Sequence, residues 1–239
     1  MENNRLEIIR DVSIDSNDMN KQLSSIYQAN WDHCCKTIEG CKAEGYELAN
    51  IYLVAASEEY FRAKTKVICL GKETQCWGGE FIDVPTIEEL MQLYTLYTYS
   101  ERGNKAAFHR FVNWISSLSP DVAVIPNNVI KIGKKYKNSY YKVVADKLHE
   151  QVNLLKEEIL ILNPSIIICP TSNLEAYNQP MAELLGNYTE NIIQQDLFVS
   201  ERRYEAFPNI PFIMCPHPQG KKRVKLDQVK EIISRYILD

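Results

Sequence analysis

The sequence predicts an α/β protein, built as a three-layer α/β/α sandwich around a central, mainly parallel, four-stranded sheet. Four short apolar runs, each closed by proline or glycine, are the first observation behind this prediction. The runs are apolar throughout rather than alternating, which is typical of strands covered on both faces. The segments between them are long enough for the crossover helices that parallel strands need.

The first 60 residues are expected to form a helical extension that packs on the main domain, which takes up residues 61–239. Amphipathic patterns over about residues 19–41 and 46–62 predict two helices here. No linker rich in Gly, Pro or Ser separates these helices from the main domain. We therefore expect one main domain with an N-terminal extension (residues 1–60).

Strands and helices are expected to alternate through the main domain. The predicted strands are residues 66–70, 122–125, 165–169 and 211–215, and the predicted crossover helices lie within residues 86–118, 140–162 and 174–185. Glycine or proline comes after each strand and indicates where it ends. The pattern between about Glu190 and Phe207 predicts an additional edge strand or hairpin.

The composition is that of an ordinary globular protein. Of the 239 residues, 45% are apolar and 24% are charged, and this composition argues against disorder. A chain of this length can also bury a hydrophobic core. No apolar run approaches the roughly 18 residues that cross a bilayer, and the first residues carry acids where a signal peptide needs a basic stretch. We therefore expect a cytoplasmic protein, in which Cys69, Cys169 and Cys215 are buried thiols.

Side chains capable of chemistry lie after three of the predicted strands. Glu73 lies in the loop that starts with Gly71 and could polarise a water molecule. Asn127 offers a donor and an acceptor to a base edge, although the adjacent Asn128 could take that role. His217 lies between two prolines, which fix the backbone around the imidazole. Because ligands bind outside the carboxyl ends of parallel strands, we expect an acid, an amide and an imidazole in one cleft.

In this order, over roughly residues 66–239, these segments resemble the motifs of the uracil-DNA glycosylase superfamily. The resemblance implies that Glu73 stands where many members carry the Asp or Asn that positions the attacking water. Asn127 stands where members carry the Asn that reads the flipped pyrimidine. The segment from His217 to Gln219 resembles the His-Pro-Ser motif, whose His stabilises the departing base anion and whose adjoining loop enters the DNA minor groove.

The chain departs from the superfamily pattern at several positions. Lys72 replaces a polar Gln before the acid, Thr74 replaces a proline after it, and Gln219 replaces the Ser of the third motif. Trp77 lies a few residues later than the aromatic residue that stacks on the base in many members. The departures leave open a bulky modified base, of the kind that a defence enzyme against foreign DNA would remove.

The resemblance implies a DNA glycosylase that hydrolyses the N-glycosidic bond of uracil or another altered pyrimidine. Glu73 and His217 are then catalytic, and Gly71, Trp77 and Asn127 contact the substrate. The nucleotide must leave the base stack and enter a snug pocket before water attacks the sugar. The base leaves with negative charge while the sugar becomes cationic, so a donor near the base and a carboxylate near the sugar both favour the transition state.

Two basic stretches accompany these motifs in the sequence. Residues 131–142 hold five lysines, three tyrosines and no acid, and a second basic cluster comes directly after His217. The residues expected to bind DNA are Gln219, Lys221, Lys222 and Arg223. The net charge of −4 argues against a generally basic surface, but a local patch can still bind phosphates. We expect a monomer that binds single- or double-stranded DNA and no membrane.

No metal or other cofactor is expected. The one tempting group of metal ligands contains no Cys-x-x-Cys pair; it comprises His33, Cys34, Cys35 and Cys41. The glycines from Gly71 to Gly78 lack the Gly-Lys-Ser/Thr sequence of a phosphate-binding P-loop, so the sequence does not indicate nucleotide hydrolysis.

The candidate residues also have ordinary interpretations. Glu73 could be a solvated loop residue, Trp77 could plug its loop against the core, and Asn127 could be a turn residue. The main alternative function is a catalytically inactive nucleic-acid or nucleotide-binding module of the same fold. A third possibility is a protein-interaction domain that uses the N-terminal helices around Trp31 and Cys34.

Overall fold

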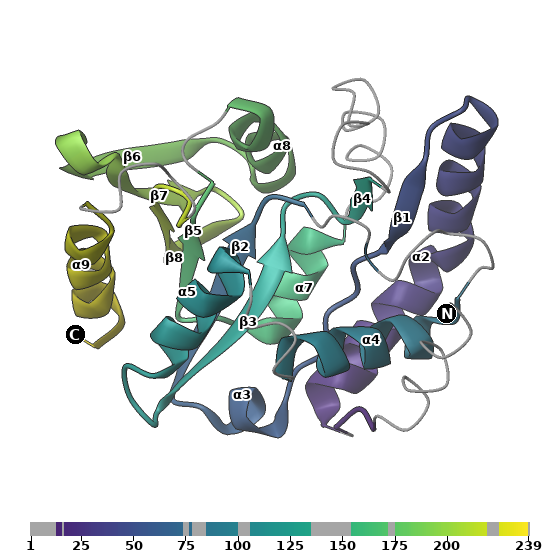
Figure 1. Ribbon diagram of the computed structural model, residues 1–239, viewed down its shortest axis with the longest axis horizontal. Helices are drawn as coiled ribbons and strands as arrows, with labels where there is room; N and C mark the ends of the chain where they lie inside the picture. The colour runs from purple at the N-terminus through teal and green to yellow at the C-terminus, as the bar shows by residue number, and fades with distance from the viewer. Residues whose placement is uncertain are drawn as a thin grey trace. The chain divides into compact units, whose positions relative to one another are not determined.

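The computed structural model describes residues 13–15, 17–73, 77, 85–99, 106–134, 154–171, 175–218 and 225–238. By their contacts, these residues form two compact units. The first unit consists of the described residues within 1–58, 73–100 and 130–161, and the second of those within 59–72, 101–129 and 162–239. The chain first passes from one unit to the other between Glu58 and Glu59. Figure 1 shows the elements in chain order.

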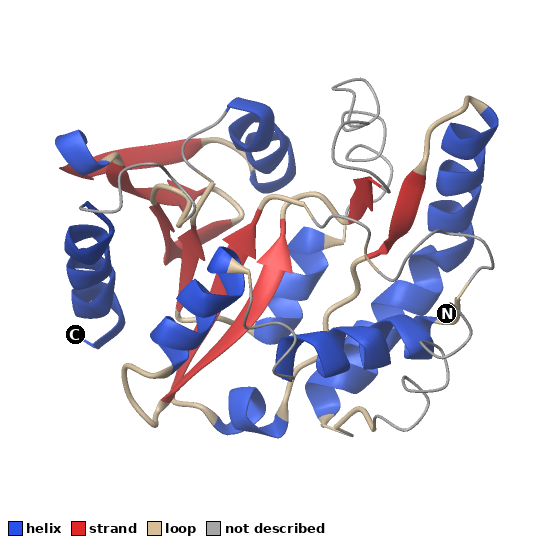
Figure 2. Ribbon diagram, in the orientation of Figure 1, coloured by secondary structure: helices blue, strands red, loops and turns tan. Residues whose placement is uncertain are grey.

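The second unit is an α/β structure around a six-stranded mixed sheet with the strand order β3-β2-β5-β8-β7-β6 (Figure 2). The strands are β2 (Thr65–Gly71), β3 (Val122–Asn128), β5 (Ile166–Cys169), β6 (Tyr188–Gln194), β7 (Val199–Tyr204) and β8 (Phe207–Met214). The four neighbours β3, β2, β5 and β8 run parallel to one another. Strand β7 pairs antiparallel with β8 on one side and with β6 on the other. The four predicted strands are therefore confirmed, and they form the parallel part of the sheet.

The prediction of a four-stranded sheet is wrong in number, because β6 and β7 extend the sheet to six strands. They form the hairpin that was predicted between about residues 190 and 207, with the short 3-10 helix η2 (Gln195–Leu197) between them. Most of β6 is exposed, including Ile192, which is 57% exposed. A strand without a buried face carries no clear apolar pattern, so the sequence indicated this hairpin only weakly.

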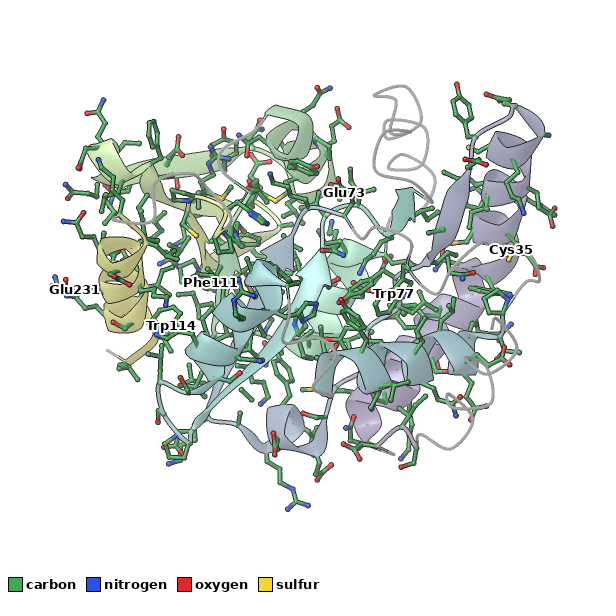
Figure 3. The ribbon with its side chains drawn as sticks, viewed as in Figure 1. Cys35, Glu73, Trp77, Phe111, Trp114 and Glu231 are labelled. Carbon is green, nitrogen blue, oxygen red and sulfur yellow. The ribbon has the colours of Figure 1, made fainter. Side chains whose placement is uncertain are left out.

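One face of the six-stranded sheet is covered by α5 (Ala107–Ser116) and α9 (Leu226–Leu238). Phe111 and Trp114 belong to α5 (Figure 3). Lys230 of α9 lies 5.0 Å from the centroid of the Trp114 ring. The sheet residues of this core are Val67, Cys69, Val122, Val124, Ile166, Ile168, Val199, Ile213 and Cys215. Helix α9 was not predicted, although its buried residues recur every four positions at Val229, Ile233 and Ile237.

The residues that alternate with this core are buried as well. They include Ile68, Leu70, Ile125, Ile167, Phe212 and Met214, each of which has no exposed side-chain surface. Successive residues of a strand point to opposite faces, so the parallel strands are covered on both sides. This explains why each predicted strand is an unbroken apolar run. Cys69, Cys169 and Cys215 are free thiols buried in this sheet or directly after it, as predicted.

The remaining helices of the second unit are α3 (Glu58–Arg62), which begins at the passage between the units, and α8 (Glu175–Leu185). Helix α8 comes after β5 and confirms the predicted crossover helix over residues 174–185. Pro180 lies inside α8.

The first unit combines helices with a small sheet. Its elements are α2 (Asp18–Ala43), β1 (Leu48–Ile51), α4 (Ile87–Tyr99), β4 (Ile132–Lys134) and α7 (Leu155–Leu162). Strands β1 and β4 pair antiparallel. Helix α2 confirms the prediction over residues 19–41, and the Asn17 side chain caps it by accepting a hydrogen bond from the Asn20 N–H at 2.9 Å.

The predicted helix over residues 46–62 is wrong. This segment contains β1, an extended stretch and then only the five-residue helix α3. Residues 48–56 are all buried, so both sides of the extended chain are covered. Apolar residues therefore occur throughout, and some of them fall at helical spacing by composition alone.

A buried polar network ties the first unit together. The Lys131 ammonium and the Glu158 carboxylate form an ion pair in which both side chains are at most 2% exposed. The Tyr27 hydroxyl donates to Glu158 Oε1 at 2.9 Å and accepts from the Val54 N–H at 3.1 Å. The Lys131 ammonium also lies 5.7 Å from the centroid of the Tyr52 ring. Lys131, the first lysine of the basic stretch over residues 131–142, therefore does not offer its charge to a phosphate, because that charge is buried against Glu158.

None of the helices in the described part of the chain is both long and apolar enough to pass through a membrane.

Candidate functional site

The carboxyl ends of four parallel strands lie side by side at one edge of the sheet in the second unit. In the strand order, β3 ends at Asn128, β2 at Gly71, β5 at Cys169 and β8 at Met214. We call the polar residues and the glycine at this edge the strand-end site, which consists of Gly71, Lys72, Asn127, Asn128, Thr171, Tyr177 and His217. Parallel sheets bind ligands at this edge, because the loops that come after the strands meet there.

Gly71 is held in close contact with β3 and α5. It pairs with Asn128, and a Cβ atom added to it would lie 2.6 Å from Asn128 Oδ1 and 3.1 Å from the Phe108 ring. The Gly71 carbonyl accepts a hydrogen bond from the Val129 N–H at 3.0 Å. Only glycine leaves room for this approach. Substrate contact by Gly71 stays a prediction, whereas its role in packing is evident.

Asn127 and Asn128 belong to β3 itself and not to a loop after it. The predicted end of this strand at Val122–Ile125 is therefore too early by three residues, because Pro126 continues the strand. Proline is tolerated here because β3 is the edge strand of the sheet and needs no N–H on its outer side. The two asparagines consequently point to opposite faces.

This alternation separates the two candidate amides. Asn128 shares a face with Gly71 and the Phe108 ring of α5. Asn127 lies on the other face, next to Leu70 in the pairing of β2 with β3. It is fully buried, and its Oδ1 atom accepts a hydrogen bond from the Asn128 N–H at 2.8 Å. A buried amide of fixed orientation is suited to reading the edge of a base.

His217 lies three residues beyond the end of β8 and is half-buried. Burial lowers its pKa from 6.5 to about 4, and the nearby positive charge of Lys72 acts in the same direction. The imidazole is therefore neutral near neutral pH. A neutral imidazole carries one N–H, which can donate a hydrogen bond to an acceptor in the site.

Lys72 comes directly after the last residue of β2, which has β3 on one side and β5 on the other. Its Nζ atom lies 5.6 Å from the centroid of the Tyr177 ring, in the first turn of α8. A cation at this distance from the face of an aromatic ring is attracted by the ring's electrons. The ammonium thus has a defined place at the edge of the sheet, within electrostatic reach of His217.

Sequence reasoning missed Thr171 and Tyr177 of the strand-end site, and it noted Lys72 only as a departure from the motif. Thr171 lies just after β5, is fully buried, and its N–H donates to the Cys169 carbonyl at 2.8 Å. Its Oγ1 atom has no hydrogen-bond partner among the residues that the structure describes. An unpaired buried hydroxyl costs about 1–3 kcal/mol. A polar residue after the third parallel strand was the signal that could have identified it.

Glu73 and Trp77, which are labelled in Figure 3, belong by their contacts to the first unit. Trp77 is 5% exposed, and its ring lies edge-to-face against Tyr52 at 4.7 Å and Tyr97 at 5.4 Å between centroids. Its carbonyl accepts a hydrogen bond from the Asn50 N–H at 3.2 Å. This is the packing of a core residue, and stacking of Trp77 on a base stays a prediction. The half-buried Glu73 is the next residue after Lys72 in the chain.

The four residues expected to bind DNA lie outside the described residues: Gln219, Lys221, Lys222 and Arg223. The described chain resumes at Lys225, whose ammonium donates to the Asp196 carbonyl at 2.8 Å and contacts Asp196 Oδ2 at 3.2 Å. Lys225 therefore extends the basic cluster in sequence but is already engaged by an acid.

Comparison with protein-family models gives no match for this chain, and no curated protein matches it either. Its function must therefore be inferred from the chemistry of the site. The strand-end site combines one ammonium, one neutral imidazole, two amides and two hydroxyls. All of these can donate a hydrogen bond, so the arrangement favours an acceptor that gains negative charge.

Proposed function

We propose that the protein is a DNA glycosylase of the uracil-DNA glycosylase type, with the α/β/α sandwich of that superfamily, acting on uracil or another altered pyrimidine. The observation that carries the proposal is that Lys72 and His217 come shortly after two of four adjacent parallel strands, at the edge where their carboxyl ends meet. Burial and the charge of Lys72 lower the pKa of His217, which keeps its imidazole neutral. Both groups stabilise an anion, and the departing base is the anion that N-glycosidic cleavage produces. The resemblance of the three segments around Glu73, Asn127 and His217 gives independent support.

In the proposed reaction, the bond between the sugar C1′ and the base nitrogen breaks, and its electron pair leaves with the base. The N–H of His217 donates to the oxygen on which the negative charge of the base accumulates. Water adds to C1′, and the Glu73 carboxylate accepts the proton that the water loses. The products are the free base and a sugar with a hydroxyl group at C1′.

Base recognition is assigned to Asn127, whose fixed, buried amide would pair with the edge of the flipped pyrimidine. Trp77 is the proposed stacking residue from the sequence resemblance. The basic segment after His217 would bind phosphates on either side of the flipped nucleotide; its residues are Gln219, Lys221, Lys222 and Arg223. The proposal requires no cofactor.

The experiment that tests the proposal is base release from single- and double-stranded oligonucleotides containing uracil, hypoxanthine, and methylated, hydroxymethylated or glycosylated pyrimidines. Release by the wild type should be reduced by His217→Ala and by Glu73→Ala. His33→Ala and Glu39→Ala are matched controls, because both side chains are exposed on α2. Full release by the variant lacking both Glu73 and His217 would rule out the assigned mechanism.

The second candidate function is a nucleic-acid or nucleotide-binding module that lacks the reaction. The replaced motif residues Lys72, Thr74 and Gln219 favour it. Tight, salt-sensitive DNA binding without release of any base across the panel is the result that this alternative predicts. Release of any one base excludes it.

A further inference from the structure

Lys72 places a positive charge at the carboxyl ends of the parallel strands, where the proposed reaction would take place. It comes directly after β2, which lies between β3 and β5 in the sheet, and its charge acts on His217, which comes after β8. The segment around Lys72 resembles glycosylase motifs that carry a neutral Gln here, so the charge is a property of this chain. The Lys72 ammonium lies 5.6 Å from the centroid of the Tyr177 ring, which gives it a defined position.

The effect of Lys72 on His217 has a chemical consequence. A histidine that carries a proton can stabilise an anion by its charge, but His217 stays neutral beside the ammonium and offers only its N–H dipole. The positive charge of this pair is therefore located on Lys72. A hydrogen bond from an ammonium to an anionic acceptor is roughly twice as strong as one between neutral groups.

We propose that Lys72 is a catalytic residue of the glycosylase reaction. Its ammonium and the N–H of His217 together stabilise the negative charge of the departing pyrimidine. This inference rests on the proposed function and deepens it. As the bond from C1′ to the base nitrogen breaks, the electron pair moves into the base, and the Lys72 ammonium stabilises the negative charge that appears on its carbonyl oxygen. Lys72 keeps its proton throughout, and the water proton goes to Glu73.

If Lys72 stabilises the departing anion, the loss caused by removing Lys72 should be larger for a base that carries negative charge less easily. Uracil is a poorer leaving group than 5-fluorouracil, because the fluorine helps the ring to carry negative charge. Removing Lys72 should therefore harm release of uracil more than release of 5-fluorouracil. A lysine that only bound a DNA phosphate would contribute equally to both substrates, since their backbones are the same.

The first test compares single-turnover release of uracil and 5-fluorouracil from otherwise identical oligonucleotides. Lys72→Gln should slow uracil release roughly 100- to 1,000-fold, the scale on which loss of one charge-stabilising donor reduces catalysis, and slow 5-fluorouracil release clearly less. Lys72→Arg, which keeps the charge, should recover part of the loss. Lys64→Gln is the matched control, because Lys64 lies in the same unit with 78% of its side chain exposed.

Equal slowing of both substrates by Lys72→Gln, or no slowing of either, would overturn the proposal while leaving the glycosylase function in place. A second measurement tests the role of Lys72 even if the protein turns out not to be a glycosylase. The free base 5-nitrouracil is ionised at about pH 8 and mimics the departing anion, whereas free uracil is largely neutral there. Its binding can be followed through the NMR signals of the His217 ring without any turnover.

The wild type should bind 5-nitrouracil more tightly than uracil, and Lys72→Gln should remove most of this preference. If binding prefers the anion and depends on Lys72, but no oligonucleotide releases its base, then Lys72 does recognise the anionic base and the proposed glycosylase function is wrong. Equal affinity of the wild type for both free bases would overturn the role of Lys72 whatever the outcome of the release assay.

Discussion

The two units each contain a lysine near another titratable side chain, but the surroundings of the two lysines are opposite. In the first unit, buried Lys131 pairs with the Glu158 carboxylate, to which Tyr27 also donates a hydrogen bond. In the second unit, burial and the positive charge of Lys72 both oppose protonation of His217. One arrangement matches a positive charge with a negative one, and the other sets a positive charge next to a group that could become positive.

The difference indicates that the Lys131–Glu158 cluster stabilises the fold and that the Lys72–His217 cluster is suited to catalysis. A buried ion pair whose members also make hydrogen bonds offsets the cost of taking charges out of water. A cation next to an imidazole brings no such benefit to the folded state. Arrangements of this kind concentrate at functional sites, where pKa values are displaced for a purpose. We therefore expect mutations in the two clusters to affect different quantities.

The largest effect on stability is expected in the first unit. Glu158→Gln removes the carboxylate and leaves Lys131 buried without its counter-charge, which should lower the free energy of unfolding by about 3–5 kcal/mol. Urea unfolding followed by circular dichroism measures this change. Glu231→Gln breaks an exposed ion pair with Arg235 on α9 and should cost less than about 1 kcal/mol. Similar losses for the two variants would contradict the structural role of the buried pair.

A smaller loss is expected where the strand-end site is packed most closely. Gly71→Ala places a methyl group 2.6 Å from Asn128 Oδ1, so the strands or the Asn128 side chain must shift. Overpacking of this kind costs about 1–3 kcal/mol in the free energy of unfolding. The double variant Gly71→Ala with Asn128→Ala should regain part of the loss. If Gly71→Ala unfolds at the same urea concentration as the wild type, the close approach of β2 and β3 is not as described.

Almost no loss of stability is expected for Lys72→Gln. The ammonium contacts the Tyr177 ring but opposes protonation of His217, so removing it should change the free energy of unfolding by less than about 1 kcal/mol. Base release, by contrast, should fall clearly. A variant that is strongly destabilised would mean that Lys72 resembles Lys131 in holding the fold.

The smallest and most specific effect concerns the pKa of His217. An NMR titration of its ring should give a midpoint near pH 4 in the wild type. Lys72→Gln should raise this pKa, but it should remain below 6.5 because burial is the larger cause of the shift. An unchanged midpoint would show that the Lys72 charge does not reach the imidazole.

The same shift sets the direction of a pH effect on stability. The pKa of His217 is lower in the folded protein than in the unfolded chain, so the unfolded chain takes up the proton first as the pH falls. The contribution of neutral His217 to stability is complete above about pH 6.5 and is lost progressively toward pH 4. Replacing His217 with Ala should reduce the slope of stability against pH in this window. An identical slope would contradict the assignment.

The parallel part of the sheet could be predicted from the sequence because burial on both faces leaves an unbroken apolar run. The run ending at Cys169 is an example, since Ile166, Ile167 and Ile168 are buried on alternating sides of β5. The same reasoning fails around β1, where full burial also removes any period and the pattern was interpreted as a helix. Exposed β6 could be found only as a weak hairpin signal, because none of its faces is buried.

The chemistry of the site could be predicted only in part. His217 and the asparagines stood out because they come after apolar runs, and the structure places them at one edge of the sheet. Their electrostatic state could not be predicted, since the neutrality of His217 depends on burial and on Lys72, which is 145 positions away in the chain. The Thr171 hydroxyl, which has no hydrogen-bond partner in the described part of the chain, and the burial of Lys131 are likewise consequences of tertiary packing.

The decisive measurement is single-turnover release of uracil from one oligonucleotide by the wild type, Lys72→Gln and His217→Ala. We expect release by the wild type and a marked slowing in both variants, while their urea unfolding midpoints stay close to that of the wild type. Release that proceeds at the wild-type rate in both folded variants would show that the anion-stabilising pair at the strand ends does not carry the reaction.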